Sequence, residues 1–247
     1  MKMSRIILPI ILLLLFSADQ LNAQPQPKVE HRLTPWYIGM QGGIPLGVST
    51  FSSFGADNAR VGYQVGAMIG YRINHLFSTE FSTTFGRVEL GSNKCCTDYW
   101  LGADGMHYVS PVAGMRGYYY RNLYSSVAMQ QLGLHFNIDL TQLIKHNETT
   151  RWSVLLSPAI YGVGTQASMK AAESHNQLFK TNRQFNFGVG AGVGIGYRIA
   201  EQWSIRFSSG LNCITGSHYD GIPDADHNEN FVWNNSLSFI WQLGRSK

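Results

Sequence analysis

The chain has 247 residues, of which 19 are Lys or Arg and 15 are Asp or Glu, giving a net charge of +4. Charged residues make up only 14% of the chain, aromatic residues make up 13%, and there are 26 glycines. This composition excludes a disordered chain, a collagen-like chain and a strongly charged nucleic-acid-binding protein. The three cysteines are too few for a disulfide scaffold.

The first residues have the pattern of a secretory signal peptide. Lys2 and Arg5 precede an apolar run at 6–16, and Ala23 offers a small residue at a cleavage point. The run is too short to span a bilayer as a stable helix, so we expect residues 1–23 to be removed on export, with a thin-membrane anchor as the alternative. Residues 24–35 then form a periplasmic lead-in. No later segment approaches 18 continuous apolar residues, which excludes a helical membrane protein.

From Trp36 onward the dominant period is two, which is typical of β-strands with one apolar face. Phe77, Phe81 and Phe85, for example, lie on one face of a run whose other face is polar or glycine. A short turn of helix is expected at 140–145. The alternation predicts eight strands, at 36–45, 61–72, 77–86, 131–140, 152–165, 185–199, 203–213 and 231–243.

The lengths of the links between these segments predict the topology. Every even-to-odd link is short, whereas the odd-to-even links are long and cover 46–60, 88–126, 166–184 and 214–230. Alternation of this kind is the pattern of an outer-membrane barrel. We therefore expect residues 36–247 to form an eight-stranded antiparallel up-and-down transmembrane β-barrel, with four long extracellular loops and three short periplasmic turns.

The polarity of the two strand faces distinguishes a membrane barrel from a soluble, lipocalin-like carrier. The second face carries charged and amide side chains such as Glu80, Asn137 and Arg206, together with many glycines and serines. Charged residues are too costly to face hydrocarbon, so this face should line the lumen and the apolar face should meet lipid. Aromatic residues gather at both ends of the apolar face, as expected for the two membrane interfaces.

Five stretches resemble a known family: GIPLGVSTFSSFGAD (43–57), CCTDYWLGADG (95–105), SPVAGMRG (110–117), SPAIYGVGT (157–165) and ITGSHYDGIPD (214–224). They are similar to the N-terminal barrel of OmpA-family outer-membrane proteins of Bacteroides-type bacteria, over residues 36–243. The resemblance implies a barrel in the outer membrane of a Gram-negative bacterium. Family members usually continue into a periplasmic domain that binds peptidoglycan. This sequence ends six residues after Trp241, so we expect neither that domain nor its tethering function.

Five charged residues are expected to point into the lumen near the short-turn end. In a confined space each charge is unfavourable unless it is paired. We therefore expect Glu80 to bridge Arg72 or Arg206, and the cluster to plug a lumen that is only wide enough for side chains. The members of this lumen charge cluster are Arg72, Glu80, Asp139, Arg198 and Arg206.

The second long loop is rich in aromatic residues, which favour interfaces. Two interpretations remain open: the rings pack on one another, or they form a docking surface for another outer-membrane protein. The candidate docking residues are Tyr99, Trp100, Tyr108, Tyr118, Tyr119 and Tyr120.

The three cysteines suggest a disulfide rather than a metal site, because no His or Cys lies at zinc spacing from the adjacent pair Cys95 and Cys96. In an oxidising environment the bridge could join these two residues to each other or join one of them to Cys213. The sequence does not choose between these pairings.

Other patterns that suggest chemistry have plainer explanations. The glycines from 188 to 196 fall at every second position, so they line one strand face rather than cradle a nucleotide. The acidic residues of the fourth loop match no calcium-loop spacing, and solvated charge is the expected role. The grouping of Ser217, His218 and Asp220 is too local for a catalytic triad. The acidic residues are Asp220, Asp224, Asp226 and Glu229.

The sequence therefore predicts a small outer-membrane barrel with a structural or accessory role, with no open pore, enzymatic activity, metal or cofactor. The alternatives are a subunit of a larger outer-membrane complex that docks through its long loops, a lipid-modifying barrel enzyme, and a narrow pore. Expected partners are outer-membrane lipid and lipopolysaccharide and, in the subunit alternative, another outer-membrane protein. No nucleic-acid partner is expected.

Overall fold

The computed structural model describes residues 34–56, 58–94, 96–144, 150–216, 219–222 and 230–244. The predicted signal peptide at 1–23 and all but the last two residues of the lead-in lie outside the described residues. No helix within the described ranges is long and apolar enough to cross a bilayer.

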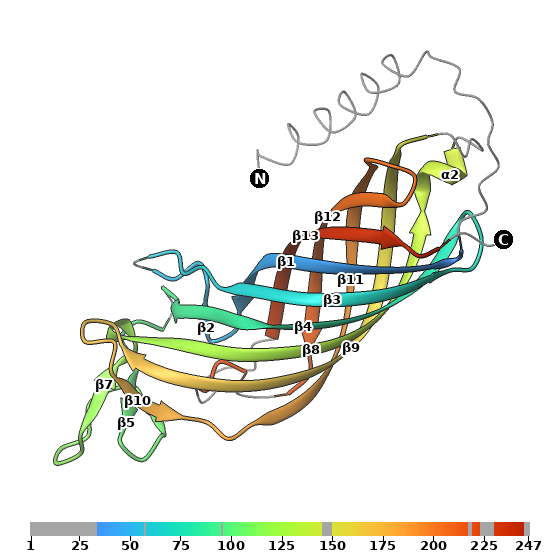
Figure 1. Cartoon of the computed structure of the whole chain (residues 1–247). Helices are drawn as coiled ribbons and strands as arrows, with labels where there is room; N and C mark the ends of the chain where they lie inside the picture. The colour runs from blue at the N-terminus through green and yellow to red at the C-terminus, as the bar shows by residue number, and fades with distance from the viewer. Residues whose placement is uncertain are drawn as a thin grey trace. The chain divides into compact units, whose positions relative to one another are not determined.

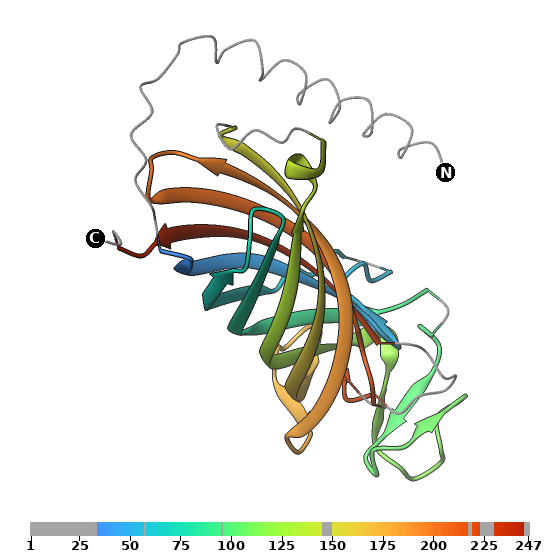
Figure 2. The ribbon, with the colours of Figure 1, turned by 90° about the vertical axis from the view of Figure 1, so that its right-hand side faces the viewer.

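Eight long strands form a closed antiparallel ring (Figures 1 and 2). Each strand pairs with the next long strand of the sequence, and the last pairs with the first, where Tyr37 lies opposite Gln242. The predicted up-and-down barrel is confirmed. Its strands are β1 (Trp36–Val48), β3 (Tyr63–Arg72), β4 (Phe77–Ser92), β8 (Leu123–Asp139), β9 (Trp152–Ala171), β11 (Gln184–Arg198), β12 (Trp203–Ile214) and β13 (Asn230–Gln242).

The outer wall of the ring is apolar. In register, Ile69 of β3 lies opposite Phe81 of β4, which lies opposite Leu134 of β8, which lies opposite Ile160 of β9. Side chains alternate across a strand, so the positions between these point into the lumen. The apolar wall faces outward, as predicted. Its large exposed side chains include Ile69, Phe77, Phe81, Phe85, Leu132, Phe136, Ile160, Phe187, Val193, Phe207, Leu237 and Phe239.

Aromatic pairs mark the short-turn end of the outer wall. The ring centroids of Trp36 and Tyr71 are 4.9 Å apart, and those of Trp152 and Tyr197 are 4.8 Å apart. Trp203 stacks on Trp241 at 5.6 Å. Amphipathic rings at one level suit a membrane interface, and this arrangement agrees with the predicted aromatic belt.

Local hydrogen bonds shape the short links in the part of the chain that the structure describes. In the turn at 73–76, Asn74 Oδ1 accepts hydrogen bonds from the backbone N–H groups of Leu76 and Phe77, at 2.9 and 2.7 Å. The expected helical turn is present as α2 (Leu140–Ile144), and Asp139 Oδ1 accepts from the Thr141 N–H at 3.0 Å. Short side-chain acceptors of this kind favour turns and helix starts.

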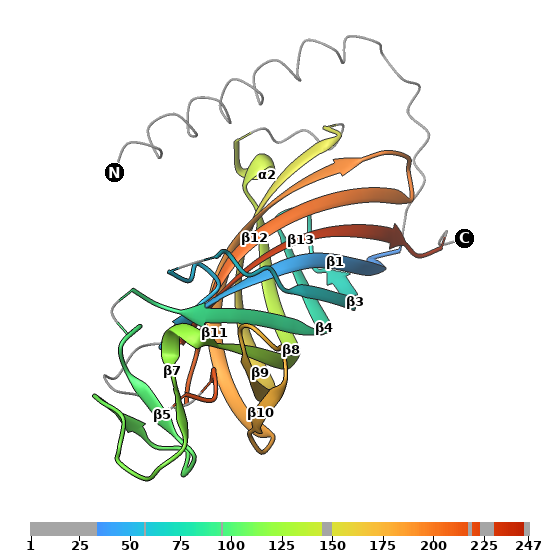
Figure 3. The same cartoon turned by 90° about the vertical axis from the view of Figure 1, so that its left-hand side faces the viewer.

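The long-link end is more ordered than predicted, because β4, β8 and β9 continue beyond the apolar wall (Figure 3). The sequence pattern ended these strands at 86, 131 and 165, where outward residues cease to be apolar. Backbone pairing nevertheless continues, with Glu89 opposite Ser126 and Tyr124 opposite Lys170. The second loop therefore spans 93–122 instead of 88–126.

The extracellular loops contain short elements of their own. The second loop folds into a three-stranded sheet of β5 (Trp100–Gly102), β6 (His107–Tyr108) and β7 (Gly117–Tyr119), followed by the 3-10 turn η2 (Tyr120–Asn122). The first loop returns through β2 (Phe51–Ser52), which pairs with β1 and β4. The third loop adds β10 (Gln177–Lys180) to the edge of β9.

Candidate functional site

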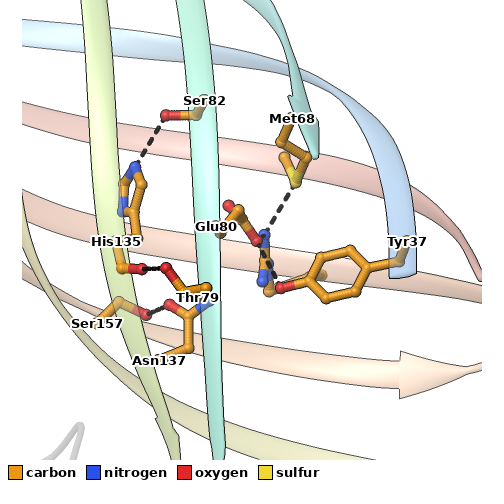
Figure 4. Close-up of polar contacts among 9 residues, drawn as sticks. Tyr37, Met68, Thr79, Glu80, Ser82, His135, Asn137 and Ser157 are labelled. Atoms are coloured by element: carbon orange, nitrogen blue, oxygen red, sulfur yellow. Dashed lines mark hydrogen bonds and ion pairs between the residues drawn. The ribbon is translucent and has the colours of Figure 1, made fainter. Parts of the chain in front are cut away.

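The barrel interior holds one buried ion pair near the short-turn end. Glu80 of β4 and Arg206 of β12 approach to 2.7 Å, and their side chains are only 5% and 9% exposed. The Tyr37 hydroxyl donates to the same Glu80 oxygen at 3.2 Å, and Arg206 Nη2 also contacts Met68 Sδ at 3.1 Å (Figure 4). Gly70 makes room for this group, because a Cβ there would collide with the Tyr37 ring. The pair is therefore held from several strands at once.

The other members of the predicted lumen charge cluster do not join this pair. Arg72 and Arg198 are exposed at the last residues of β3 and β11, where Arg198 donates to the Thr150 carbonyl at 2.9 Å. Asp139 is half-buried and caps α2. The prediction of a single layer of five charges was wrong, because three of them lie at the strand ends, within reach of water. Of the two predicted bridges, the structure contains the one from Glu80 to Arg206.

Above the ion pair lies a polar cavity. His135 Nε2 is 2.9 Å from Ser82 Oγ, and Ser157 donates to Asn137 Oδ1 at 2.6 Å (Figure 4). The cavity offers about 80 Å³ to water-sized molecules, which exceeds the space that one bound water needs. Among the described residues, Gln64 Oε1 finds no hydrogen-bond partner, although it is buried and Gln64 lines the cavity. The chamber is therefore suited to bound water.

The alternating glycines of β11 open space in this polar region. A Cβ at Gly190 would collide with Asn212 Oδ1, and a Cβ at Gly196 would collide with Ser153 Oγ. At Gly194 it would come within 3.5 Å of the Arg206 side chain. These positions support the interpretation that the glycines make room for neighbours across a narrow lumen.

The extracellular half of the interior is mainly apolar, which the sequence pattern did not predict. Inward positions change from polar to apolar above Thr84 of β4, where Val88 and Leu90 follow. Loop residues from far along the chain fill the space between them. We call this set the apolar plug: Phe51, Val88, Leu90, Cys96, Leu101, Tyr120, Leu123, Val127, Met129, Val163, Ala167, Met169, Ile214, Tyr219, Ile222 and Val232.

Asp220 fastens the fourth loop to the apolar plug. Its side chain is fully buried, and its two carboxylate oxygens accept from the N–H groups of Phe51 at 2.7 Å and Ile222 at 3.0 Å. The Ser125 hydroxyl donates to the Asp220 carbonyl. Beside it, burial raises the pKa of the Tyr219 hydroxyl far above its ordinary value, and the Asp220 charge adds to this effect. Asp220 therefore joins the first and fourth loops inside the barrel mouth.

The remaining fourth-loop predictions fall mostly outside the described residues. This applies to Asp224, Asp226 and Glu229 of the acidic cluster, and to Ser217 and His218 of the grouping rejected as a triad. The prediction of solvated charge was wrong for Asp220, because its carboxylate is buried against backbone N–H groups. Within the described ranges, no group of three His, Cys, Asp or Glu side chains could hold a metal ion.

The aromatic residues of the second loop divide between the plug and the surface. Tyr120 is fully buried, Trp100 is 4% exposed, and Tyr99 packs against the plug, with its ring 6.0 Å from that of Tyr120. Tyr118 is 46% exposed, and Tyr108 is half-buried. The prediction of a docking surface was therefore wrong for Trp100 and Tyr120, because they form the packed base of the loop.

A hydrogen bond closes the turn between β5 and β6. The Tyr108 hydroxyl donates to Asp104 Oδ2 at 2.5 Å, and the Met106 N–H donates to Asp104 Oδ1 at 3.0 Å. The Tyr108 bond, followed by the backbone bond, lowers the pKa of the Asp104 carboxyl. The same bond raises the pKa of Tyr108.

The cysteine predictions are only partly described. Cys96 is buried in the apolar plug, and Cys213 is half-buried near the end of β12. No disulfide joins Cys96 to Cys213. Cys95 lies outside the described residues, as do the pairings predicted for it.

A family model covers most of the chain. The family model for the outer membrane protein beta-barrel domain matches residues 8–239. No curated protein matches the chain. Among solved structures, Neisserial surface protein A is 12% identical, with 85% of this chain and 98% of that chain covered and a TM-score of 0.47. OprG from Pseudomonas aeruginosa is 8% identical, with 87% and 100% covered and a TM-score of 0.43. A major outer membrane protein from Thermus thermophilus is 11% identical, with 83% and 99% covered and a TM-score of 0.44.

Proposed function

Because the chain belongs to the outer membrane protein beta-barrel domain family and is a protein of the Gram-negative outer membrane, we propose that it is a closed barrel with a structural or accessory role. In this role the barrel anchors folded loops at the cell surface, conducts no ions and catalyses no reaction. The observation that carries the proposal is that the lumen is filled at two levels. An ion pair fills it near one end and the apolar plug fills it near the other.

The two levels support closure in series. Near the periplasmic end, Glu80 and Arg206 meet across the lumen at 2.7 Å, so two opposite charges neutralise each other in the path of an ion. Near the extracellular end, fully buried residues such as Phe51, Leu90 and Tyr219 occupy the mouth. An apolar constriction opposes ion passage by excluding water.

The interior also offers little for an enzyme that acts on lipids. The hydrogen-bonded pair of Ser82 and His135 is the arrangement nearest to a nucleophile and base among the described residues. Ser82 is buried on the lumen face, and the adjoining cavity offers only about 80 Å³. A lipid on the outer wall would not reach it.

Conductance measurement tests the closed-barrel proposal. We expect the purified, refolded chain to give no steady current in planar bilayers, whereas an open porin inserted in the same membranes supplies the positive control. Stable, ion-selective channels from the unmutated chain would overturn the proposal and favour the narrow pore.

A second candidate function is docking to another outer-membrane protein through the sheet of the second loop. The observation that favours it is a set of exposed apolar side chains on and beside this sheet, with Met106 58%, Val109 77% and Val112 37% exposed. Exposed apolar surface of this kind marks interaction sites when it is contiguous.

Mild extraction from cells tests the docking function. A stoichiometric partner that co-purifies with the unmutated chain, and is lost from a Val109→Asp/Val112→Asp variant, would support it. The absence of any stoichiometric partner would favour the free barrel. A partner retained by the double variant would place docking elsewhere on the chain.

A further inference from the structure

The outer wall of β4, β8 and β9 changes character above the membrane band. The last large apolar residues that face outward are Phe85, Leu132 and Ile160. Arg87 follows two residues beyond Phe85 on the same face of β4 and is exposed. A cation therefore stands directly above the part of the wall that meets acyl chains.

A second tier of cations lies further along the same wall. Arg60 Cζ is 4.3 Å from the centre of the Tyr124 ring, and Lys170 Nζ is 5.6 Å from it. Tyr124 is opposite both Lys170 and Gly91. Gly91 keeps the path of Arg60 open, because a Cβ there would come within 3.1 Å of Arg60 Nε. The tyrosine ring thus forms a platform for two cations from different segments.

The cations Arg60, Arg87 and Lys170 outnumber the carboxylates on the same section of the wall. Neither of the ion pairs observed among the described residues, Arg121–Asp98 and Arg206–Glu80, involves Arg60, Arg87 or Lys170. Glu89 is the one carboxylate among the described strand residues of this section of wall, and it accepts a hydrogen bond from the Ser126 hydroxyl at 2.6 Å. Glu173 lies in the turn just after β9, so three cations against two carboxylates give this section, with its adjoining loop residues, a net charge of +1.

We propose that Arg60, Arg87 and Lys170 form a binding site for the phosphorylated sugar headgroup of outer-leaflet lipopolysaccharide. The ligand class follows from the position of the cations. The apolar wall, which meets acyl chains, continues directly into two tiers of cations. An amphiphile with an anionic head matches both parts. Arg and Lys near a membrane surface attract such headgroups, and phosphate is their usual partner.

The site deepens the proposed anchoring role but can be tested separately from it. It requires that the barrel lie in the outer membrane, and it does not require that the lumen be closed. A barrel that conducts ions could still bind the headgroup, and a closed barrel could fail to bind it.

Binding of purified lipopolysaccharide to the refolded full chain in nanodiscs tests the proposal. An Arg60→Gln/Lys170→Gln double variant should weaken binding about 30-fold, because each cation contributes to attraction by an anionic surface. Glu89→Gln should tighten binding about fivefold, since it removes the opposing charge. Arg121→Gln is the matched control, because Arg121 also lies over a tyrosine ring, at 4.8 Å from Tyr119, but is paired with Asp98. Its affinity should stay within about twofold of the unmutated chain.

Two further probes identify the source of the phosphate. Enzymatically dephosphorylated lipopolysaccharide should bind the unmutated chain as weakly as intact lipopolysaccharide binds the double variant. Inorganic phosphate should not compete at millimolar concentration, because it lacks the acyl chains. Equal losses in the double variant and in Arg121→Gln, or displacement by inorganic phosphate alone, would overturn the proposal. Folding of each variant is verified by its mobility shift in unheated gels.

Discussion

The two halves of the barrel interior are both buried but are filled by opposite chemistry. The periplasmic half holds Glu80 and Arg206 with amide and hydroxyl side chains around a polar cavity. The extracellular half holds the apolar plug, to which loops contribute Phe51 and Tyr219. A barrel lumen can thus be filled either by strand residues that satisfy one another or by loops that fold inward.

The halves also differ in what holds them together. The polar half is stabilised by side chains of neighbouring and opposite strands, so its strength depends on pairing every charge. The apolar half depends on loops that are distant in sequence, and Asp220 fixes one of them by accepting from backbone N–H groups. Variants can therefore weaken each half by a different mechanism.

The largest effect is expected in the polar half. Glu80→Ala leaves Arg206 buried without its carboxylate, which should lower the free energy of unfolding by about 3–5 kcal/mol. Urea unfolding in lipid vesicles measures this change. The Glu80→Ala/Arg206→Met double variant should recover most of the loss, because no unpaired charge remains. If the double variant lost as much free energy of unfolding as Glu80→Ala alone, the pair would be hydrated rather than buried.

The next largest effect is expected where the fourth loop meets the plug. Asp220→Ala removes the acceptor of the Phe51 and Ile222 N–H groups and should lower the free energy of unfolding by about 3 kcal/mol. Proteolysis at the barrel mouth should accelerate in parallel. Asp220→Asn keeps one acceptor oxygen and should lose less. If Asp220→Ala resists protease like the unmutated chain, the loop is held mainly by apolar contacts.

Two nearly isosteric substitutions should affect the two halves differently. Val163→Thr places a hydroxyl in the apolar plug and should lower the free energy of unfolding by about 1–2 kcal/mol. Thr84→Val removes a hydroxyl from the wall of the polar cavity and should change stability by less than about 1 kcal/mol. Both are measured by urea unfolding. A larger loss from Thr84→Val would mean that the stability of the polar cavity depends on that hydroxyl.

The smallest effect concerns the loop sheet outside both halves. Because the Tyr108 hydroxyl lowers the pKa of Asp104, this carboxylate favours the folded turn above its ordinary pKa. That contribution is lost as the pH falls through the lowered value. Tyr108→Phe should raise the pKa of Asp104 toward its ordinary value, as measured by carboxyl-carbon NMR titration. Tyr118→Phe, which changes an exposed tyrosine of the same sheet, should leave the titration unchanged.

The strands and their facing could be predicted from sequence because period-two alternation is local. Phe81 and Leu134 identify the lipid face without knowledge of their partners. The strand ends could not be predicted in the same way, since outward residues such as Glu89 and Lys170 become polar where the wall leaves the bilayer. Hydrogen bonding between the backbones continues there, but the side-chain pattern does not indicate it.

The interior was harder to predict than the wall. The bridge from Glu80 to Arg206 could be proposed because both residues point inward at similar depth, whereas the exposure of Arg72 depends on where β3 ends. The inward Val88 and Leu90 were the available signal for the apolar plug. Their partners, such as Tyr219, come from loops whose path depends on long-range packing.

The pairing of β1 with β13 has a consequence for how the protein is made. Gln242 Nε2 donates to the Thr34 carbonyl across 208 positions of sequence, and the two strands pair along their whole length. Contacts of such high sequence separation form late and slowly. A nascent chain that lacks β13 would present unpaired backbone edges, which hydrocarbon does not tolerate. Closure must therefore follow completion of synthesis, and a truncated chain should fail to insert rather than form a smaller barrel.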